Sequence, residues 1–79
     1  MERQFLYLRN RCINIAHIVE IVHYERDSFD ENGIPFDTEC FRIIYNCGNT
    51  VKKLEIHKIP FDFRAMKNYE MVHNFMYGV

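Results

Sequence analysis

Alternating apolar and polar positions dominate the first three quarters of the chain and predict β-strands. Phe41, Ile43 and Tyr45 recur at every second position, as expected for a strand with two different faces. Residues 46–49, Asn-Cys-Gly-Asn, predict a hairpin turn because Asn and Gly tolerate positive φ. Enrichment in aromatic and β-branched residues predicts strands at about 4–9, 12–15, 18–26, 39–46 and 50–57.

The hydrophobic period changes near the end of the chain and becomes helical. Between residues 63 and 77, apolar residues recur at steps of three and four, at Ala65, Tyr69, Val72 and Met76. Asp62 precedes this pattern and can cap a helix, and Gly78 follows it as a natural stop. The pattern therefore predicts one helix at about 61–77.

The segment 27–38 separates the third and fourth strands and has the composition of a loop. It is rich in acids, and it holds Asn-Gly at positions 32–33 as well as Pro35. We therefore expect an α+β fold, an antiparallel β-meander of four to five strands with one C-terminal α-helix packed on a face. A length of 79 residues predicts a single domain, 1–79.

Composition is typical of a globular protein and excludes disorder as the default. Hydrophobic residues make up 48% and charged residues 27% of the chain. Three cysteines without a CxxC pair favour reduced thiols over a disulfide framework. The N-terminus does not resemble a signal peptide, and no apolar run approaches the ~18 residues of a membrane span. We expect a soluble cytoplasmic protein with no membrane partner.

The net charge of −1 is the result of cancellation between segments of opposite charge. Residues 20–40 carry seven acids against one base, for a net charge of −6. The flanking segments are basic, with +2 over residues 1–19 and +3 over residues 41–79. Charge can therefore act locally although it vanishes in sum.

Cysteine and histidine spacing favours neither a metal centre nor a thiol enzyme. Six residues separate Cys40 from Cys47 and five separate His17 from His23, without the close ligand pairs of zinc sites. Cys47 lies in a turn and is the best nucleophile candidate, but the sequence supplies no base for it. We therefore expect no catalytic residue, no metal and no cofactor, and a protein that is not an enzyme.

Surplus apolar surface favours protein association. Twelve Phe and Tyr residues and four Met exceed what one interface between a sheet and a helix readily hides. The candidate interaction residues are those that lie partly outside the main helical stripe, namely Phe63, Met66, Met71, Phe75 and Tyr77. We expect a small protein-interaction or regulatory domain that forms a homo-oligomer. Alternatively, sheet and loop of the same chain cover both sides of the helix.

A second hypothesis is a nucleic-acid-binding regulator. Basic residues cluster on the last predicted hairpin and just beyond it, at Arg42, Lys52, Lys53 and Lys58. Tyrosines on the strands could stack on single-stranded bases beside these charges. However, the chain has no RNP-like motif, and the same basic residues can pair with the acidic segment.

Two segments resemble the layout of small bacterial and phage β-meander domains. Residues 13–21 read Ile-Asn-Ile-Ala-His-Ile-Val-Glu-Ile, a strand that ends in Ile-Asn, a corner and an Ile-x-x-Ile strand. Residues 41–50 resemble the strand-turn-Gly-strand that follows in those proteins. The layout is similar to that of the FlbD-like flagellar regulators and of LytTR DNA-binding domains.

This resemblance spans about residues 5–56 and implies an architecture only. The acidic segment 27–38 departs from the compact FlbD-like pattern. No LytTR recognition residue can be placed on this chain, so no functional residue is carried over.

Overall fold

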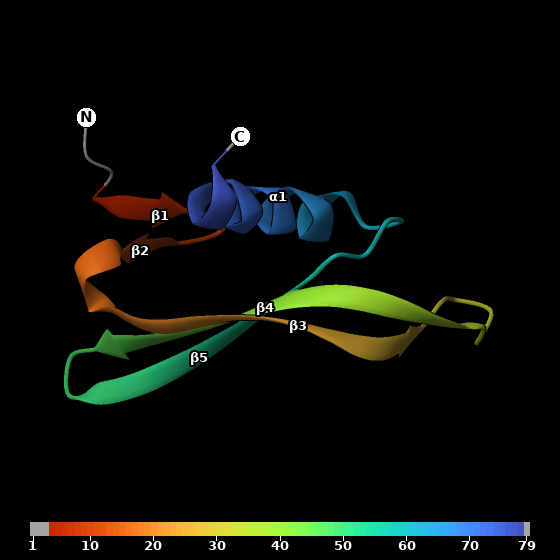
Figure 1. Ribbon diagram of the computed structural model, residues 1–79, viewed down its shortest axis with the longest axis horizontal. Helices are drawn as coiled ribbons and strands as arrows, with labels where there is room; N and C mark the ends of the chain where they lie inside the picture. Colours follow the sequence, from red (N-terminus) through yellow and green to blue (C-terminus); the bar gives the residue numbers. More distant parts are fainter. Residues whose placement is uncertain (1–3, 79) are drawn as a thin grey trace.

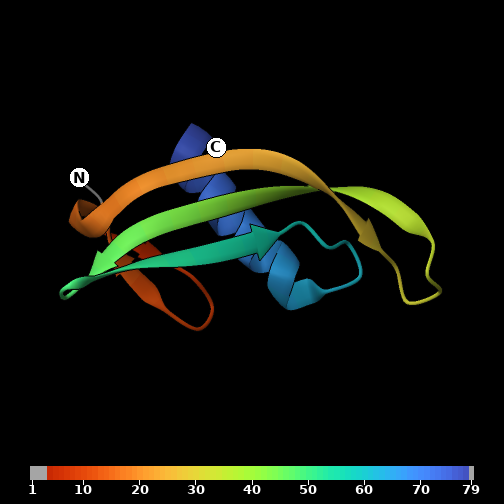
Figure 2. The same ribbon diagram turned by 90° about the horizontal axis from the view of Figure 1, so that it is seen from below.

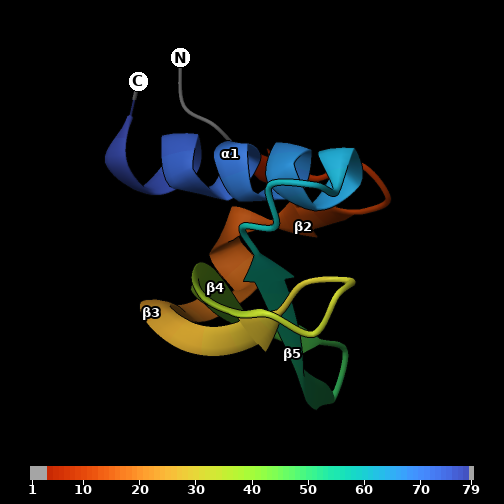
Figure 3. The same ribbon diagram turned by 90° about the vertical axis from the view of Figure 1, so that its right-hand side faces the viewer.

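The molecule has two layers, one made of a three-stranded antiparallel sheet and the other of a two-stranded hairpin and the helix (Figures 1 and 3). The computed structural model describes residues 4–78. In chain order its elements are β1 (Phe5–Tyr7), β2 (Cys12–Asn14), the 3₁₀ turn η1 (Ile15–His17), β3 (Ile18–Phe29), β4 (Pro35–Cys47), β5 (Thr50–His57) and α1 (Phe63–Tyr77). The α+β class with one C-terminal helix packed on antiparallel strands is confirmed. The five strands form two sheets, ordered β1-β2 and β3-β4-β5.

Local signals place the helix and the last hairpin where the sequence predicts them. The Asp62 carboxylate caps α1 by accepting the backbone N–H groups of Arg64 and Ala65 at 3.0 and 3.2 Å. Gly78 ends the helix with a φ of +74°, a conformation that glycine adopts without steric cost. Gly48 has a φ of +63° in the turn between β4 and β5.

The acidic segment 27–38, predicted to be a loop, is mostly strand. β3 continues to Phe29 and β4 begins at Pro35, so only residues 30–34 form the connection. The Asp30 carboxylate organises this turn by accepting the N–H groups of Asn32 and Ile34, each at 2.9 Å. The loop prediction was wrong because the turn occupies only positions 30–34, and the other seven residues of the segment are in strands.

The extended hairpin of β3 and β4 projects from the body of the molecule. β5 pairs only with Cys40–Cys47 of β4, so the first residues of β4 pair with β3 alone. We call residues 25–39 the arm. Figure 2 shows its tip extending beyond both β5 and α1, and the molecule measures 41 × 29 × 20 Å.

The core lies between the three-stranded sheet and the layer of helix and hairpin. Its buried side chains are Leu6, Ile13, Phe41, Ile43, Ile56, Tyr69 and Val72. Phe41 of β4 is fully buried and packs against the Tyr69 ring with centroids 5.1 Å apart. Burial of each such large side chain stabilises the fold by about 1.5–3 kcal/mol. The predicted inward face of α1 is confirmed at Tyr69 and Val72, whereas Met76, near the end of the helix, is 37% exposed.

Candidate functional site

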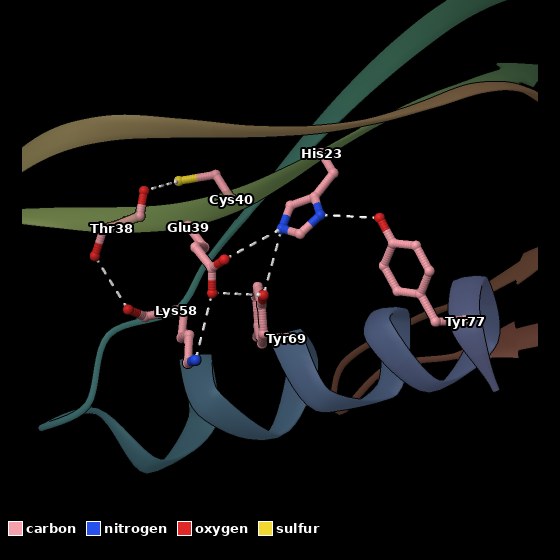
Figure 4. Close-up of polar contacts among 7 residues, drawn as sticks. All are labelled: His23, Thr38, Glu39, Cys40, Lys58, Tyr69 and Tyr77. Atoms are coloured by element: carbon pink, nitrogen blue, oxygen red, sulfur yellow. Dashed lines mark hydrogen bonds and ion pairs between the residues drawn. The ribbon is translucent and has the colours of Figure 1, made fainter. Parts of the chain in front are cut away.

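A cluster of polar side chains joins α1 to β3 and β4 on one side of the core (Figure 4). We call His23, Glu39, Lys58, Tyr69 and Tyr77 the polar cluster. The sheet contributes His23 and Glu39, the segment after β5 contributes Lys58, and the helix contributes the two tyrosines. The His23 ring stacks on the fully buried Phe41 ring at 4.4 Å, which fixes its position.

Hydrogen bonds run through the polar cluster as a chain. The Tyr69 hydroxyl donates to Glu39 Oε2 at 3.2 Å, and Lys58 Nζ donates to the same oxygen at 3.4 Å. His23 Nε2 lies 3.4 Å from the Tyr69 oxygen and 3.9 Å from Glu39 Oε1. Its Nδ1 lies 2.9 Å from the Tyr77 hydroxyl. With the proton on Nε2, His23 donates to Tyr69 and accepts from Tyr77.

These contacts set the charges of the polar cluster. The hydrogen bond from Tyr69, followed by that from Lys58, lowers the pKa of Glu39 below its ordinary value. Burial, reinforced by the nearby Glu39 charge, raises the pKa of Tyr69 to about 12. Glu39 is therefore a carboxylate and Tyr69 a protonated hydrogen-bond donor at neutral pH.

A groove of about 380 Å³ opens beside the polar cluster, and Met66, Glu70, His73 and Asn74 of α1 complete its lining. None of the described lining residues is a serine, threonine or cysteine that could serve as a nucleophile. His23 also uses both ring nitrogens within the cluster. The arrangement therefore connects the helix to the sheet.

The buried thiol is paired with a histidine that the sequence did not reveal as its partner. Cys40 and His57 lie opposite each other on β4 and β5, with Sγ 3.2 Å from Nδ1. Cys40 has no exposed surface, and this burial raises the pKa of its thiol. A protonated, inaccessible thiol packs well but is a poor nucleophile. Cys47, the candidate from the sequence, is exposed at the last position of β4.

A second feature is an apolar surface at the tip of the arm. A shallow pocket of about 280 Å³ is lined by Asp30, Ile34, Pro35, Phe36, Pro60 and Phe61. Ile34 is 58% exposed and Phe61 64% exposed, and Phe61 meets Phe36 edge to face at 6.1 Å. Phe29, which is 66% exposed, stands opposite Pro35 in the strand register. Phe36 follows Pro35 and therefore points to the other face of the arm from Phe29. We call Phe29, Ile34, Phe36 and Phe61, which gather at the end of the arm on its two faces, the tip patch.

The structure does not gather the five helix residues predicted for interaction into one surface. Met66 lines the groove, and Tyr77 belongs to the polar cluster. Phe75 packs against the core. Phe63 and Met71 are exposed, by 66% and 42%, and Tyr77 is 57% exposed although it bonds to His23. The tip patch holds three exposed side chains as well, Phe29, Ile34 and Phe61, and two of them, Ile34 and Phe61, line the same pocket.

The four basic residues of the nucleic-acid hypothesis are also dispersed. Arg42 and Lys58 each form an ion pair with a glutamate, at 3.3 and 3.4 Å. Arg42 in addition lies over the Tyr24 ring, 4.9 Å from its centroid. Lys52 and Lys53 are exposed neighbours on β5, so their side chains point to opposite faces of the sheet.

Neither a metal cluster nor a membrane-spanning helix is found in the part of the chain that the structure describes. Within residues 4–78, no group of three or more His, Cys, Asp or Glu side chains is placed to hold a metal ion. Over the same residues, no helix has both the length and the apolar character needed to cross a membrane.

Comparison with known proteins places this chain in no family. It matches no protein-family model, no curated protein and no solved structure. The resemblance to FlbD-like and LytTR layouts therefore stays a prediction, and any functional proposal has to rest on the geometry of the chain itself.

Proposed function

We propose that this chain is a non-enzymatic protein-interaction module that associates with itself through the arm. The exposure of the tip patch carries the proposal. Three of its four large apolar side chains are 58–66% exposed, and two of these, Ile34 and Phe61, line one pocket with Phe36 at the end of a projecting hairpin. A contiguous apolar surface is stabilised when a second protein surface covers it.

The tip patch supports association better than the helix does, because its residues share one location. The exposed helix residues Phe63, Met71 and Tyr77 are spread from the first to the last residue of α1. Met66 and Phe75 are half-buried within the same chain. Aromatic and aliphatic anchors contribute most to binding where they lie close enough to exclude water together.

A nucleic-acid-binding role has less support. Two of its four basic residues, Arg42 and Lys58, already neutralise glutamates. Binding a phosphate backbone depends on basic side chains that share one face and are free to replace counterions. Protein association is therefore the function that we propose.

The Ile34→Ser/Phe61→Ser double variant tests this function. We expect the average mass of the wild-type protein to rise with concentration in the micromolar range. The dissociation constant of the variant should be at least about tenfold higher than that of the wild-type protein, because two apolar anchors are lost. Sedimentation equilibrium measures the masses, and circular dichroism verifies that the variant folds.

Met71→Ser is the matched control, since it removes an exposed apolar side chain from the helix and not from the arm. It should associate like the wild-type protein. A wild-type protein that stays monomeric at every concentration would contradict the proposed function, and loss of association only in Met71→Ser would assign it to the helix instead.

A further inference from the structure

The strand register gathers acidic side chains on one face of the arm. Glu25 stands opposite Glu39, and Asp27 stands opposite Asp37. Directly opposed residues of an antiparallel pair point to the same face, so these four carboxylates form a compact array. Opposed like charges destabilise a sheet, and the array therefore costs stability within a single copy.

Most of this acidic face lacks a partner within the chain. Glu39 is paired with Lys58. Over residues 4–78, no ion pair or hydrogen bond involves the side chains of Glu25, Asp27 or Asp37. These carboxylates lie beside the tip patch, because Asp27 and Asp37 are two positions from Phe29 and Pro35 along their strands.

The opposite end of the molecule is basic around an apolar residue. β5 begins at Thr50, and Val51, Lys52 and Lys53 follow. Val51, which is 66% exposed, shares one face of the strand with Lys53, and Lys52 points to the other face. Lys52 pairs with Tyr45, whose hydroxyl accepts a hydrogen bond from Arg11 at 3.2 Å. We call Arg11, Val51, Lys52 and Lys53 the basic end.

The arm tip and the turn that adjoins the basic end lie at opposite ends of the longest axis (Figures 1 and 2). This axis measures 41 Å, about five times the Debye length at physiological ionic strength, so the charges of the two ends hardly interact within one copy. Both ends have exposed apolar side chains, and the charges beside them are negative at the arm and positive at the basic end.

We propose that the arm of one copy docks on the basic end of the next, which makes the association head-to-tail. This inference rests on the proposed self-association and adds the identity of both surfaces. The apolar residues of the arm tip cover Val51, and Lys53, which shares the face of Val51, lies against the unpaired carboxylates of the arm. Lys52 adds positive charge from the opposite face of β5. Because the two surfaces differ, a dimer retains one free arm and one free basic end, and the assembly can grow beyond a dimer.

The charge complementarity explains why a second copy fits this surface. A contact between the arms of two copies would bring two arrays of carboxylates together. Arm against basic end brings together opposite charges, both of which this chain carries. The acidic array, unfavourable in one copy, is compensated in the assembly.

Mixing two variants, each broken at a different end, tests the orientation. Ile34→Ser/Phe61→Ser breaks the arm and keeps the basic end. Lys52→Glu/Lys53→Glu breaks the basic end and keeps the arm. The dissociation constant of each variant alone should be at least about tenfold higher than that of the wild-type protein. An equimolar mixture should form a dimer that holds one of each and does not grow, as measured by sedimentation velocity and native mass spectrometry.

Arg64→Glu/Lys67→Glu is the matched control, because it changes the net charge equally through two exposed residues of α1. It should assemble like the wild-type protein. If charge reversal at the basic end lowers the thermal midpoint, Lys52→Gln/Lys53→Gln repeats the test without introducing repulsion.

The outcomes separate the two proposals. If the wild-type protein associates but Lys52→Glu/Lys53→Glu associates equally well, or the mixture yields no dimer, the head-to-tail contact is wrong while self-association stands. If the wild-type protein remains a monomer throughout, both proposals are wrong. A one-to-one dimer from two variants that are monomeric alone supports both.

Discussion

At the scale of single residues, Glu39 is the point where three elements meet. It lies on β4, accepts hydrogen bonds from Tyr69 of α1 and Lys58 of the connecting segment, and stands 3.9 Å from His23 of β3. In the sequence, Glu39 is one of seven acidic residues between positions 20 and 40. Its partners are 16 to 30 positions away, so no local pattern could reveal them.

The lowered pKa of Glu39 predicts a pH dependence of stability. Because the folded-state pKa lies below the ordinary 4.5, the unfolded chain binds the proton more readily. The stabilisation is complete above the ordinary value and is lost as the pH falls through the folded-state pKa. Glu39→Gln should therefore be less stable at neutral pH and lose less stability between about pH 5 and about pH 3.

Thermal midpoints followed by circular dichroism across this range measure the effect. Glu31→Gln serves as the control, because the Glu31 side chain lies in the exposed turn of the arm. It should follow the wild-type curve. If the thermal midpoint of Glu39→Gln falls as steeply with decreasing pH as that of the wild-type protein, Tyr69 and Lys58 do not stabilise the Glu39 carboxylate.

At the scale of elements, the arm differs most from the sequence-based expectation. Its acids lie on one face of two long strands, where Asp27 directly opposes Asp37. Composition alone indicated a solvated loop, because it contains no information on pairing register. Register depends on where the turn forms, and the Asp30 side chain determines this by bonding two backbone N–H groups of the turn.

The opposed pair predicts that one neutral substitution stabilises the arm. Asp37→Asn keeps the size of the side chain and removes a like-charge contact, so it should raise the free energy of unfolding by about 0.2–1 kcal/mol. The same change should weaken self-association, because the docking surface loses a charge.

Chemical denaturation measures the stability, and sedimentation measures the association. Asn32→Asp is the control for a change of charge, because it adds a carboxylate in the turn, where no residue stands directly opposite in the strand register. Lower stability of Asp37→Asn would mean that the carboxylate has a stabilising role within a single copy.

At the scale of the whole molecule, charge is separated along the longest axis. The sequence already indicates a segment of net charge −6 between basic flanks. Only the fold places much of that segment on a projecting arm and the start of β5 at the other end (Figure 1). An elongated body keeps the two ends apart, so they are available to neighbouring copies.

This separation predicts that salt weakens self-association. Screening shortens the Debye length from about 10 Å at 0.1 M to about 3 Å at 1 M, and charge pairing between copies weakens accordingly. The dissociation constant from sedimentation should rise with sodium chloride over this range and should change less for Lys52→Gln/Lys53→Gln. Association that strengthens with salt would indicate a contact of apolar character only.

The sequence by itself determined the kind and order of the elements. Period-two alternation, the helical stripe at Tyr69 and Val72, the cap at Asp62 and the turn at Gly48 all act within a few residues along the chain. Such signals are local, and they identified five strands, one helix and the α+β class.

Tertiary structure alone decided how these elements combine into surfaces. It divided the strands into two sheets, brought Cys40 beside His57 and placed Phe61 next to Phe36. It also dispersed the helix residues that the sequence had grouped. Contacts of this kind depend on register and on the packing of one layer against another, which join residues far apart along the chain and leave no periodic trace in it.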